Sequence, residues 1–393
     1  MYEKIIVKSE VDKLKNIIIR AEQSRAEQSR ADSYLLTSEQ SERLRILKLW
    51  LAVMVVFIHT NNLNTVERMK IIYFEPNIWV ETFEYVVSQV IGSCAVPAFF
   101  FMSAMFLYRK PFSWRENMRK KIHTLLIPYF LLITIYVIFH FCILRQLPFL
   151  KSQIMRPEEN GIMSWGFMRW LDAYTGILKT YPRIGPLWFM RDLFVLNVLS
   201  VVFVRMIDKF PKSVFVILLL IWLTAPEPDV AILKPSLQSL CFWGLGCLFV
   251  REKISLDVVD KLNSWVICAV YFALIVADVL TQDMLVHLTI HRASVLVGIV
   301  FWYRFATRIT NHNFKKHVLW LSGFNFGIYV FHAPILGYAR RACYKIFPAT
   351  AISQILQYIC LAFVLIAFCV MISVFLRKYF PRFYGVITGD RKI

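Results

Sequence analysis

Ten apolar runs, separated by short polar connections, occupy this chain between residues 46 and 376. A helix needs about 20 mostly apolar residues to cross the hydrocarbon core of a bilayer, and most of these runs reach or approach that length. Hydrophobic residues make up 58% of the 393 residues, more than the roughly 45–50% of a soluble globular chain. The pattern therefore predicts an all-α, polytopic integral-membrane bundle with spans at 46–63, 85–107, 122–143, 186–205, 213–225, 236–250, 264–280, 284–303, 318–338 and 352–376.

Basic residues concentrate in alternate connections between these spans, at 109–121, 205–212, 251–261, 304–316 and 377–382. The intervening connections carry fewer basic residues for their length, although the longest of them, 144–185, holds six. Because basic connections stay in the cytosol, we expect both termini to be cytosolic. The same bias accounts for most of the net charge of +19, so nucleic acid is not an expected partner.

Two parts of the chain differ in composition. Residues 1–42 alternate acidic and basic side chains and repeat a pentapeptide at 21–25 and 26–30. We interpret them as a charged cytosolic tail and residues 43–393 as the membrane domain. The eight cysteines include no CxxC pair, so we interpret them as small apolar residues and expect neither disulfides nor a metal site. We also expect no tightly bound cofactor.

Lys48 and His59 flank the apolar part of the first expected span, eleven residues apart. At about 100° per residue this separation returns to within about 20° of the starting direction, so both side chains project from one helix face. The helical rise separates them by roughly 16 Å along the axis. Polar groups in a span usually face a cavity. The alternative, with equal weight, is a snorkelling lysine and an interfacial histidine.

The expected topology sorts the polar residues of the spans into two zones. An outer zone contains His59, Glu84, Trp188, Arg191, Asp192, His287, His291, Arg292 and His332. An inner zone contains Lys48, Arg119, Lys120, Lys121 and His123. Lysine and arginine bind phosphates, and a histidine can take a proton from a hydroxyl group. A separation of about 16 Å suits an extended pantetheine arm, so the zones fit an acyl-coenzyme A.

Simpler interpretations of these residues remain open. The basic cluster at 109–121 also serves as a topology signal. His287 and His291 are one helical turn apart, a possible metal pair, but without a third ligand we favour cavity lining or mutual hydrogen bonding. Arg191 and Asp192 can form a local charge-balancing pair.

Four motifs appear in an order that resembles the acyltransferase type 3 family of bacterial integral-membrane acyltransferases. They are Lys48 and His59 with ten residues between them, Val96-Pro-Ala-Phe-Phe-Phe-Met-Ser-Ala104, Gly185-Pro-Leu-Trp-Phe-Met-Arg-Asp192, and Phe326-Gly-Ile-Tyr-Val-Phe-His-Ala-Pro334. The resemblance runs from about residue 43 to the end. Two positions depart from the family pattern, which more often has arginine at Lys48 and a Ser-Gly pair at Ser103-Ala104. Arg45 can compensate for the first departure, and the second leaves a close helix approach in doubt.

The resemblance implies a multi-pass protein of the bacterial inner membrane that transfers an acyl group, usually acetyl, from cytosolic acyl-coenzyme A to a hydroxyl group of a glycan or lipid-linked sugar. It implies that His59 is a general base or an acyl relay. Donor phosphates are then expected at Lys48, Arg45, Arg119, Lys120 and Lys121. The acceptor or acyl site is expected at Trp188, Arg191, Asp192, His291, Arg292 and His332. Two rivals remain: a transporter or flippase of a lipid-linked saccharide, and a sensor or scaffold.

Overall fold

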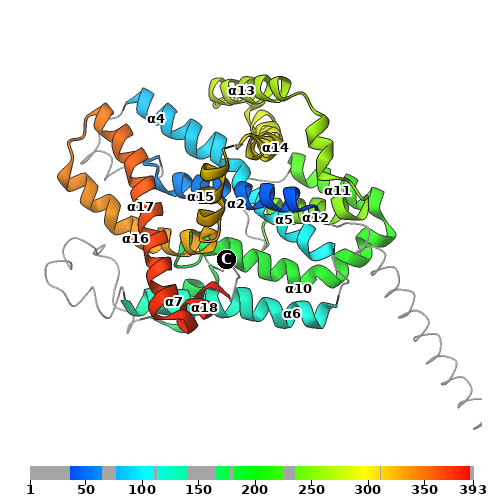
Figure 1. Ribbon diagram of the computed structural model, residues 1–393, viewed down its shortest axis with the longest axis horizontal. Helices are drawn as coiled ribbons and strands as arrows, with labels where there is room; N and C mark the ends of the chain where they lie inside the picture. Colours follow the sequence, from blue (N-terminus) through cyan, green and yellow to red (C-terminus); the bar gives the residue numbers. More distant parts are fainter. Residues whose placement is uncertain are drawn as a thin grey trace, which may run out of the picture.

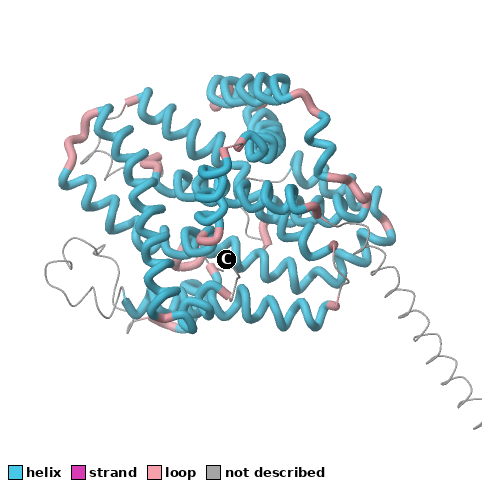
Figure 2. The backbone as a smooth tube through the Cα atoms, in the orientation of Figure 1, coloured by secondary structure: helices cyan, strands magenta, loops and turns pink. Residues whose placement is uncertain are grey.

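A computed structural model describes residues 36–63, 77–109, 113–139, 165–176, 181–224, 235–309 and 311–389. These ranges leave out most of the tail, residues 144–164 and 177–180 of the long 144–185 connection, residues 226–229 and the end of the third expected span. The described residues form helices and loops without any strand (Figure 2). The predicted all-α class is therefore confirmed.

The helices follow one another in a compact arrangement (Figure 1). Their bounds are α2 (Ser38–Thr60), α4 (Ile78–Tyr85), η1 (Val86–Ile91), η2 (Gly92–Cys94), α5 (Ala95–Tyr108), α6 (Trp114–Lys121), η3 (Ile122–Leu126), α7 (Ile127–Ile138), α9 (Phe167–Thr175), η7 (Gly185–Leu187), α10 (Trp188–Lys209), α11 (Pro211–Thr224), α12 (Leu237–Arg251), η9 (Leu256–Lys261), α13 (Ser264–Leu280), α14 (His287–Phe305), η10 (Ala306–Arg308), α15 (His312–Ser322), α16 (Asn325–Ile346), α17 (Ala351–Tyr379) and α18 (Pro381–Thr388).

Each of the ten expected spans overlaps a helix in the described part of the chain. By length and composition, four of the described helical segments can cross a membrane, and a fifth can if α15 and α16, bent by 60° at their junction, count as one span. The ten-span count and the cytosolic termini therefore stay predictions. The ninth expected span divides into α15 and α16, and the short helices α9 and α18 were not expected from the sequence.

Helix α2 lies in the middle of the bundle and packs against α5, α15, α16 and α17 (Figure 1). A capping box begins it: the Thr37 hydroxyl accepts from the Gln40 amide at 3.1 Å, and the Gln40 side chain accepts from the Thr37 amide at 3.1 Å. This exchange satisfies two backbone donors that a helix start leaves unpaired. The start of α2 is therefore well defined.

The backbones of α5 and α12 approach one another closely. A Cβ added to Gly246 would overlap the carbonyl oxygen of Phe101 and would lie 3.0 Å from the Cβ of Ala104. Small residues permit such contacts between membrane helices. The close approach that the Ser103-Ala104 pair left in doubt is present because the glycine lies on the partner helix.

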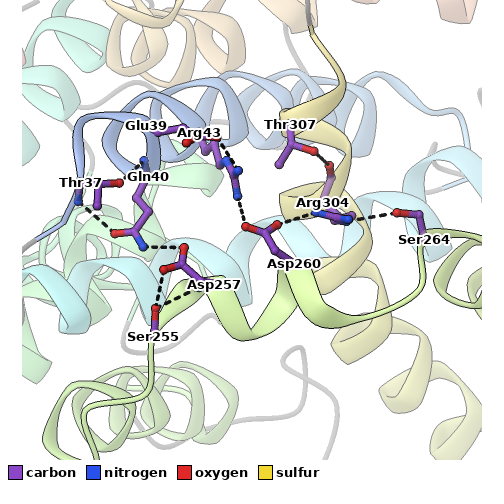
Figure 3. A network of polar contacts seen from close by, with 10 residues as sticks. All are labelled: Thr37, Glu39, Gln40, Arg43, Ser255, Asp257, Asp260, Ser264, Arg304 and Thr307. Carbon is purple, nitrogen blue, oxygen red and sulfur yellow. Dashed lines mark hydrogen bonds and ion pairs between the residues drawn. The ribbon is translucent and has the colours of Figure 1, made fainter.

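An ion-pair network ties the first turns of α2 to η9 and α14 (Figure 3). Asp260 accepts from Arg43 and from Arg304, each at 2.6 Å. The side-chain amide of Gln40 donates to Asp257 at 2.8 Å. Hydrogen bonds from Gln40 and Ser255 lower the pKa of the exposed Asp257 carboxyl below its ordinary value. The network holds the start of α2, and thereby the direction of the helix that carries Lys48 and His59.

Candidate functional site

A cavity of about 710 Å³ runs beside α2 between α5, α6, α10 and α16. Helix α2 contributes Lys48, Ala52, Val55 and His59 to its wall. These four residues follow the i, i+4, i+7, i+11 spacing of a single helix face. The structure therefore confirms that Lys48 and His59 share a face, and it shows that this face borders a cavity.

The end of the cavity near Lys48 is basic. Among the described residues, Lys48, Arg109, Lys120 and Lys121 line it together with one carboxylate, that of Glu116. The Lys48 ammonium lies 4.5 Å from the ring centre of Phe106, a cation–π distance. Four cations against one anion give this end a positive potential suited to a phosphorylated ligand.

The helix that carries Lys120 and Lys121 changes its winding where it meets the cavity. A π-helical turn, η3, follows Lys121 directly, and its residues Thr124 and Leu125 also line the cavity. A π-helical turn shifts the phase of the residues that follow, and such turns often occur at functional sites. The basic end is thus formed by the junction of α6 and η3, opposite the first half of α2.

Aromatic rings form the middle of the cavity wall. Trp188, Phe189, Phe99, Phe326 and Tyr329 all border it. The rings of Phe189 and Tyr329 are 5.9 Å apart, and those of Phe99 and Phe189 are 6.0 Å apart. The hydroxyl of Tyr329 donates to the Pro186 carbonyl at 2.7 Å, which fixes that ring. An apolar, close-packed wall of this kind accommodates an extended aliphatic or amide chain rather than a second charged group.

Two histidines meet at the other end. The rings of His59 and His332 stack with centres 5.3 Å apart and planes 27° apart. His332 is fully buried, and its Nδ1 lies 3.0 Å from the Ile328 carbonyl oxygen. Because a carbonyl only accepts hydrogen bonds, Nδ1 carries the hydrogen, and Nε2 has no hydrogen-bond partner in the described part of the chain. His332 therefore supports the His59 ring through this stacked contact.

A second cleft, of about 270 Å³, also reaches His59. Its wall comprises His59, Tyr136, Arg183, Ile184, Gly185, Pro186, Ala333, Pro334, Leu336, Gly337 and Arg340. His59 and Pro186 are the residues that it shares with the larger cavity. The imidazole therefore lies where two spaces with different walls meet.

The structure brings five of the predicted site residues to the larger cavity and His332 to its end. Lys48, His59, Lys120, Lys121 and Trp188 line it. Arg45 and Arg119 do not. Arg45 is exposed and donates to the Leu319 carbonyl of α15 at 3.1 Å, and Arg119 is exposed on α6. Charge and sequence position alone did not separate Arg119 from its neighbours Lys120 and Lys121.

Arg191 and Asp192 form a clamp away from the cavity. Asp192 is fully buried; its Oδ1 accepts from Arg191 Nε at 2.9 Å, and its Oδ2 accepts from the Ser236 amide at 2.8 Å. Arg191 also donates to the Thr175 carbonyl at 2.7 Å. The pair thus joins α10 to the end of α9 and to the start of α12. The charge-balancing interpretation describes this pair, and neither side chain reaches the cavity.

His291 and Arg292 likewise contact protein rather than the cavity. His291 Nδ1 lies 2.8 Å from Oδ2 of the buried Asp278, whose Oδ1 accepts from the Tyr85 hydroxyl at 2.7 Å. Arg292 donates to the Leu223 carbonyl, and its guanidinium lies 5.7 Å from the centre of the Trp222 ring. Among the residues described, no group of three potential metal ligands is present at this cluster or elsewhere.

The sequence interpretation missed several residues of the site. Phe189, Tyr329 and Asn325 line the larger cavity, and Arg183 and Arg340 line the cleft. Arg340 had only a weak signal, because its eight-residue separation from His332 places it about 80° around α16 from that residue. Arg183 had none, since it belonged to an expected connection whose path the sequence does not define.

The ranges that match known proteins cover the whole site. The family model described as an acyltransferase domain matches residues 42–374. Among curated proteins, the succinoglycan biosynthesis protein ExoH of Rhizobium meliloti (strain 1021) is 22% identical over 330 residues, or 80% of this chain and 82% of the relative. No solved structure matches the chain at a significant level. The matched range includes every element that lines the cavity.

Proposed function

The chain belongs to the acyltransferase type 3 family of integral-membrane acyltransferases, and from this premise we propose that it transfers an acyl group from cytosolic acyl-coenzyme A to a hydroxyl group of a cell-surface polysaccharide or its lipid-linked precursor. The acyl group that we propose is acetyl, and the membrane is the bacterial inner membrane. The name of the relative places that protein in succinoglycan biosynthesis, which supports a polysaccharide as the acceptor.

One observation carries the proposal: His59 lies at the meeting point of a long cavity with a basic end and a separate cleft. A transferase that keeps its donor on one side of a membrane and its acceptor on the other needs two such approaches to one reactive group. The phosphates of the donor bind at Lys48, Lys120 and Lys121. The pantetheine arm then follows the aromatic wall for roughly 16 Å and presents the thioester to His59.

The chemistry requires His59 to move one proton. It takes the proton of the acceptor hydroxyl while that oxygen attacks the carbonyl carbon of the thioester. The carbon–sulfur bond breaks, and the departing coenzyme A thiolate receives the proton from the imidazole. An ester and free coenzyme A result, and His59 returns to its starting state. An acyl-histidine relay is the alternative, in which the imidazole attacks the thioester first.

The test uses the purified protein with acetyl-coenzyme A labelled in the acetyl group. We expect release of free coenzyme A and the appearance of label on an added polysaccharide, and we expect both to be lost in His59→Ala at equal protein concentration. Label on the acceptor at the wild-type rate in His59→Ala would remove this residue from the reaction. The transporter alternative predicts movement of a saccharide without release of coenzyme A, so the same incubation separates the two.

A further inference from the structure

The cleft of about 270 Å³ beside His59 has two guanidinium groups in its wall, those of Arg183 and Arg340. No carboxylate belongs to the set of described residues that line it. The rest of the wall is formed mainly by small or apolar residues and the ring of Tyr136. Two cations, with no anion among the described residues of the lining, favour a negatively charged occupant.

Helix α16 carries Arg340 to the cleft. Ala333, Gly337 and Arg340 lie on one face at i, i+4 and i+7, and all three line the cleft. The small side chains of Ala333 and Gly337 leave the space into which the arginine reaches. Its terminal NH2 donates to the main-chain carbonyl of His59. Its buried Nε has no hydrogen-bond partner in the described part of the chain.

The loop that precedes η7 carries Arg183. The amide of Arg183 donates to the Ala173 carbonyl at the end of α9 at 2.8 Å, which fixes the backbone of this residue. Three residues later, Pro186 borders both the cleft and the larger cavity. Arg183 and Arg340 thus come from segments far apart in the sequence and meet at one small space, on the side of His59 away from Lys48.

An oxyanion satisfies this arrangement better than a neutral sugar does. A guanidinium presents a planar set of donors that matches the oxygen atoms of a carboxylate or phosphate. Arg183 and Arg340 both line the cleft, so an oxyanion bound there can accept from two guanidinium groups at once. The phosphates of the donor have their own basic end roughly 16 Å away, so the cleft is available to the other substrate.

We propose that the cleft binds an oxyanion carried by the acceptor, and that Arg183 and Arg340 thereby hold the reacting hydroxyl group beside His59. This inference rests on the proposed function. The anion is either the diphosphate of a lipid-linked precursor or the carboxylate of an acidic sugar. Both present oxygen atoms that two arginines can grip, so the experiment distinguishes them.

The experiment measures initial rates with purified protein, labelled acetyl-coenzyme A and three acceptors. These are a neutral oligosaccharide, the same oligosaccharide with one glucuronate residue, and the same oligosaccharide linked to a polyprenyl diphosphate. We expect one anionic form to have an acceptor KM about 10- to 100-fold lower than that of the neutral form, as one or two charge-assisted hydrogen bonds provide. The form with the lower KM identifies the source of the anion.

The variants Arg183→Gln and Arg340→Gln test the two arginines. Each is expected to raise the KM for the anionic acceptor toward that of the neutral one, to leave the KM for acetyl-coenzyme A unchanged, and to be partly rescued by lysine. Arg183→Gln is the cleaner variant, because Arg340 also contacts the backbone of His59. Arg205→Gln removes an exposed arginine far along α10 and serves as the control.

Equal KM values for neutral and anionic acceptors in the wild type would overturn this inference while label transfer to the neutral acceptor continued to support the proposed function. An equal rise in both KM values in Arg183→Gln would also overturn it, since a general structural defect gives that result. Absence of transfer to all three acceptors, with no release of coenzyme A, would instead contradict the proposed function.

Discussion

Two regions of the bundle hold charged or titratable side chains within expected spans, and they treat these groups differently. Beside α2, Lys48 and His59 point into a cavity of about 710 Å³. At the start of α10, Asp192 is fully enclosed and accepts from Arg191 and the Ser236 amide. Ionisable groups in membrane spans face cavities or partners because the hydrocarbon core cannot solvate them. The comparison teaches that a polar residue in a span indicates function only where it faces a space that a ligand can fill.

The largest expected effect is on activity, at His59. We expect His59→Ala to lower the rate of acyl transfer by about 100- to 10,000-fold, the usual range for loss of a general base, without lowering the temperature of unfolding. His291→Ala is the matched histidine in the enclosed cluster with Asp278. It is expected to lower the unfolding temperature and to leave the rate per folded molecule within about twofold. Rates from labelled acetyl-coenzyme A and scanning fluorimetry of the same samples measure both.

The opposite pattern is expected for the clamp. Asp192→Ala leaves the Arg191 guanidinium without its carboxylate, and loss of one partner from a buried ion pair costs about 3–5 kcal/mol. The free energy of unfolding, measured in detergent with a denaturant series, should fall by that amount, while the protein that remains folded keeps its rate. A stable Asp192→Ala protein with reduced transfer would place Asp192 among the functional groups instead.

The part of the site that periodicity controls was predictable from the sequence. A helical separation of eleven residues places Lys48 and His59 on one face, and in the structure both line the same cavity. The enclosed groups were not separable from the functional ones, because depth in a span does not reveal the partner. Asp192 meets Ser236 from a helix 44 residues later in the chain, and Asp278 meets Tyr85 across 193 residues. The helices themselves were predictable from apolar length, whereas the break between α15 and α16 was not.

A smaller effect is expected at Lys48. Lys48→Ala should raise the KM for acetyl-coenzyme A by about tenfold, as loss of one charge-assisted hydrogen bond to a phosphate does, and should change kcat and the acceptor KM little. Lys48→Arg should restore the donor KM, because a guanidinium also binds phosphate. An unchanged KM for acetyl-coenzyme A in Lys48→Ala would contradict the proposal that the donor phosphates bind at the basic end.

The smallest effect sharpens the comparison within a single helix. Lys120 borders the cavity, whereas its neighbour Arg119 does not. We expect Lys120→Ala to raise the KM for acetyl-coenzyme A by about two- to fivefold, since exposed charges contribute less than about 1 kcal/mol. Arg119→Ala should leave it unchanged. Equal effects of the two substitutions would mean that overall charge, and not the cavity, attracts the donor.

The most direct test of the account separates donor and acceptor by a membrane. Purified protein is placed in vesicles loaded with labelled acetyl-coenzyme A, and a polysaccharide that cannot cross the bilayer is added outside. The account predicts that label appears on the external polysaccharide while coenzyme A stays inside, and that His59→Ala vesicles show no transfer. Transfer that occurs only when both substrates are on the same side would contradict the passage of an acyl group from cavity to cleft past His59.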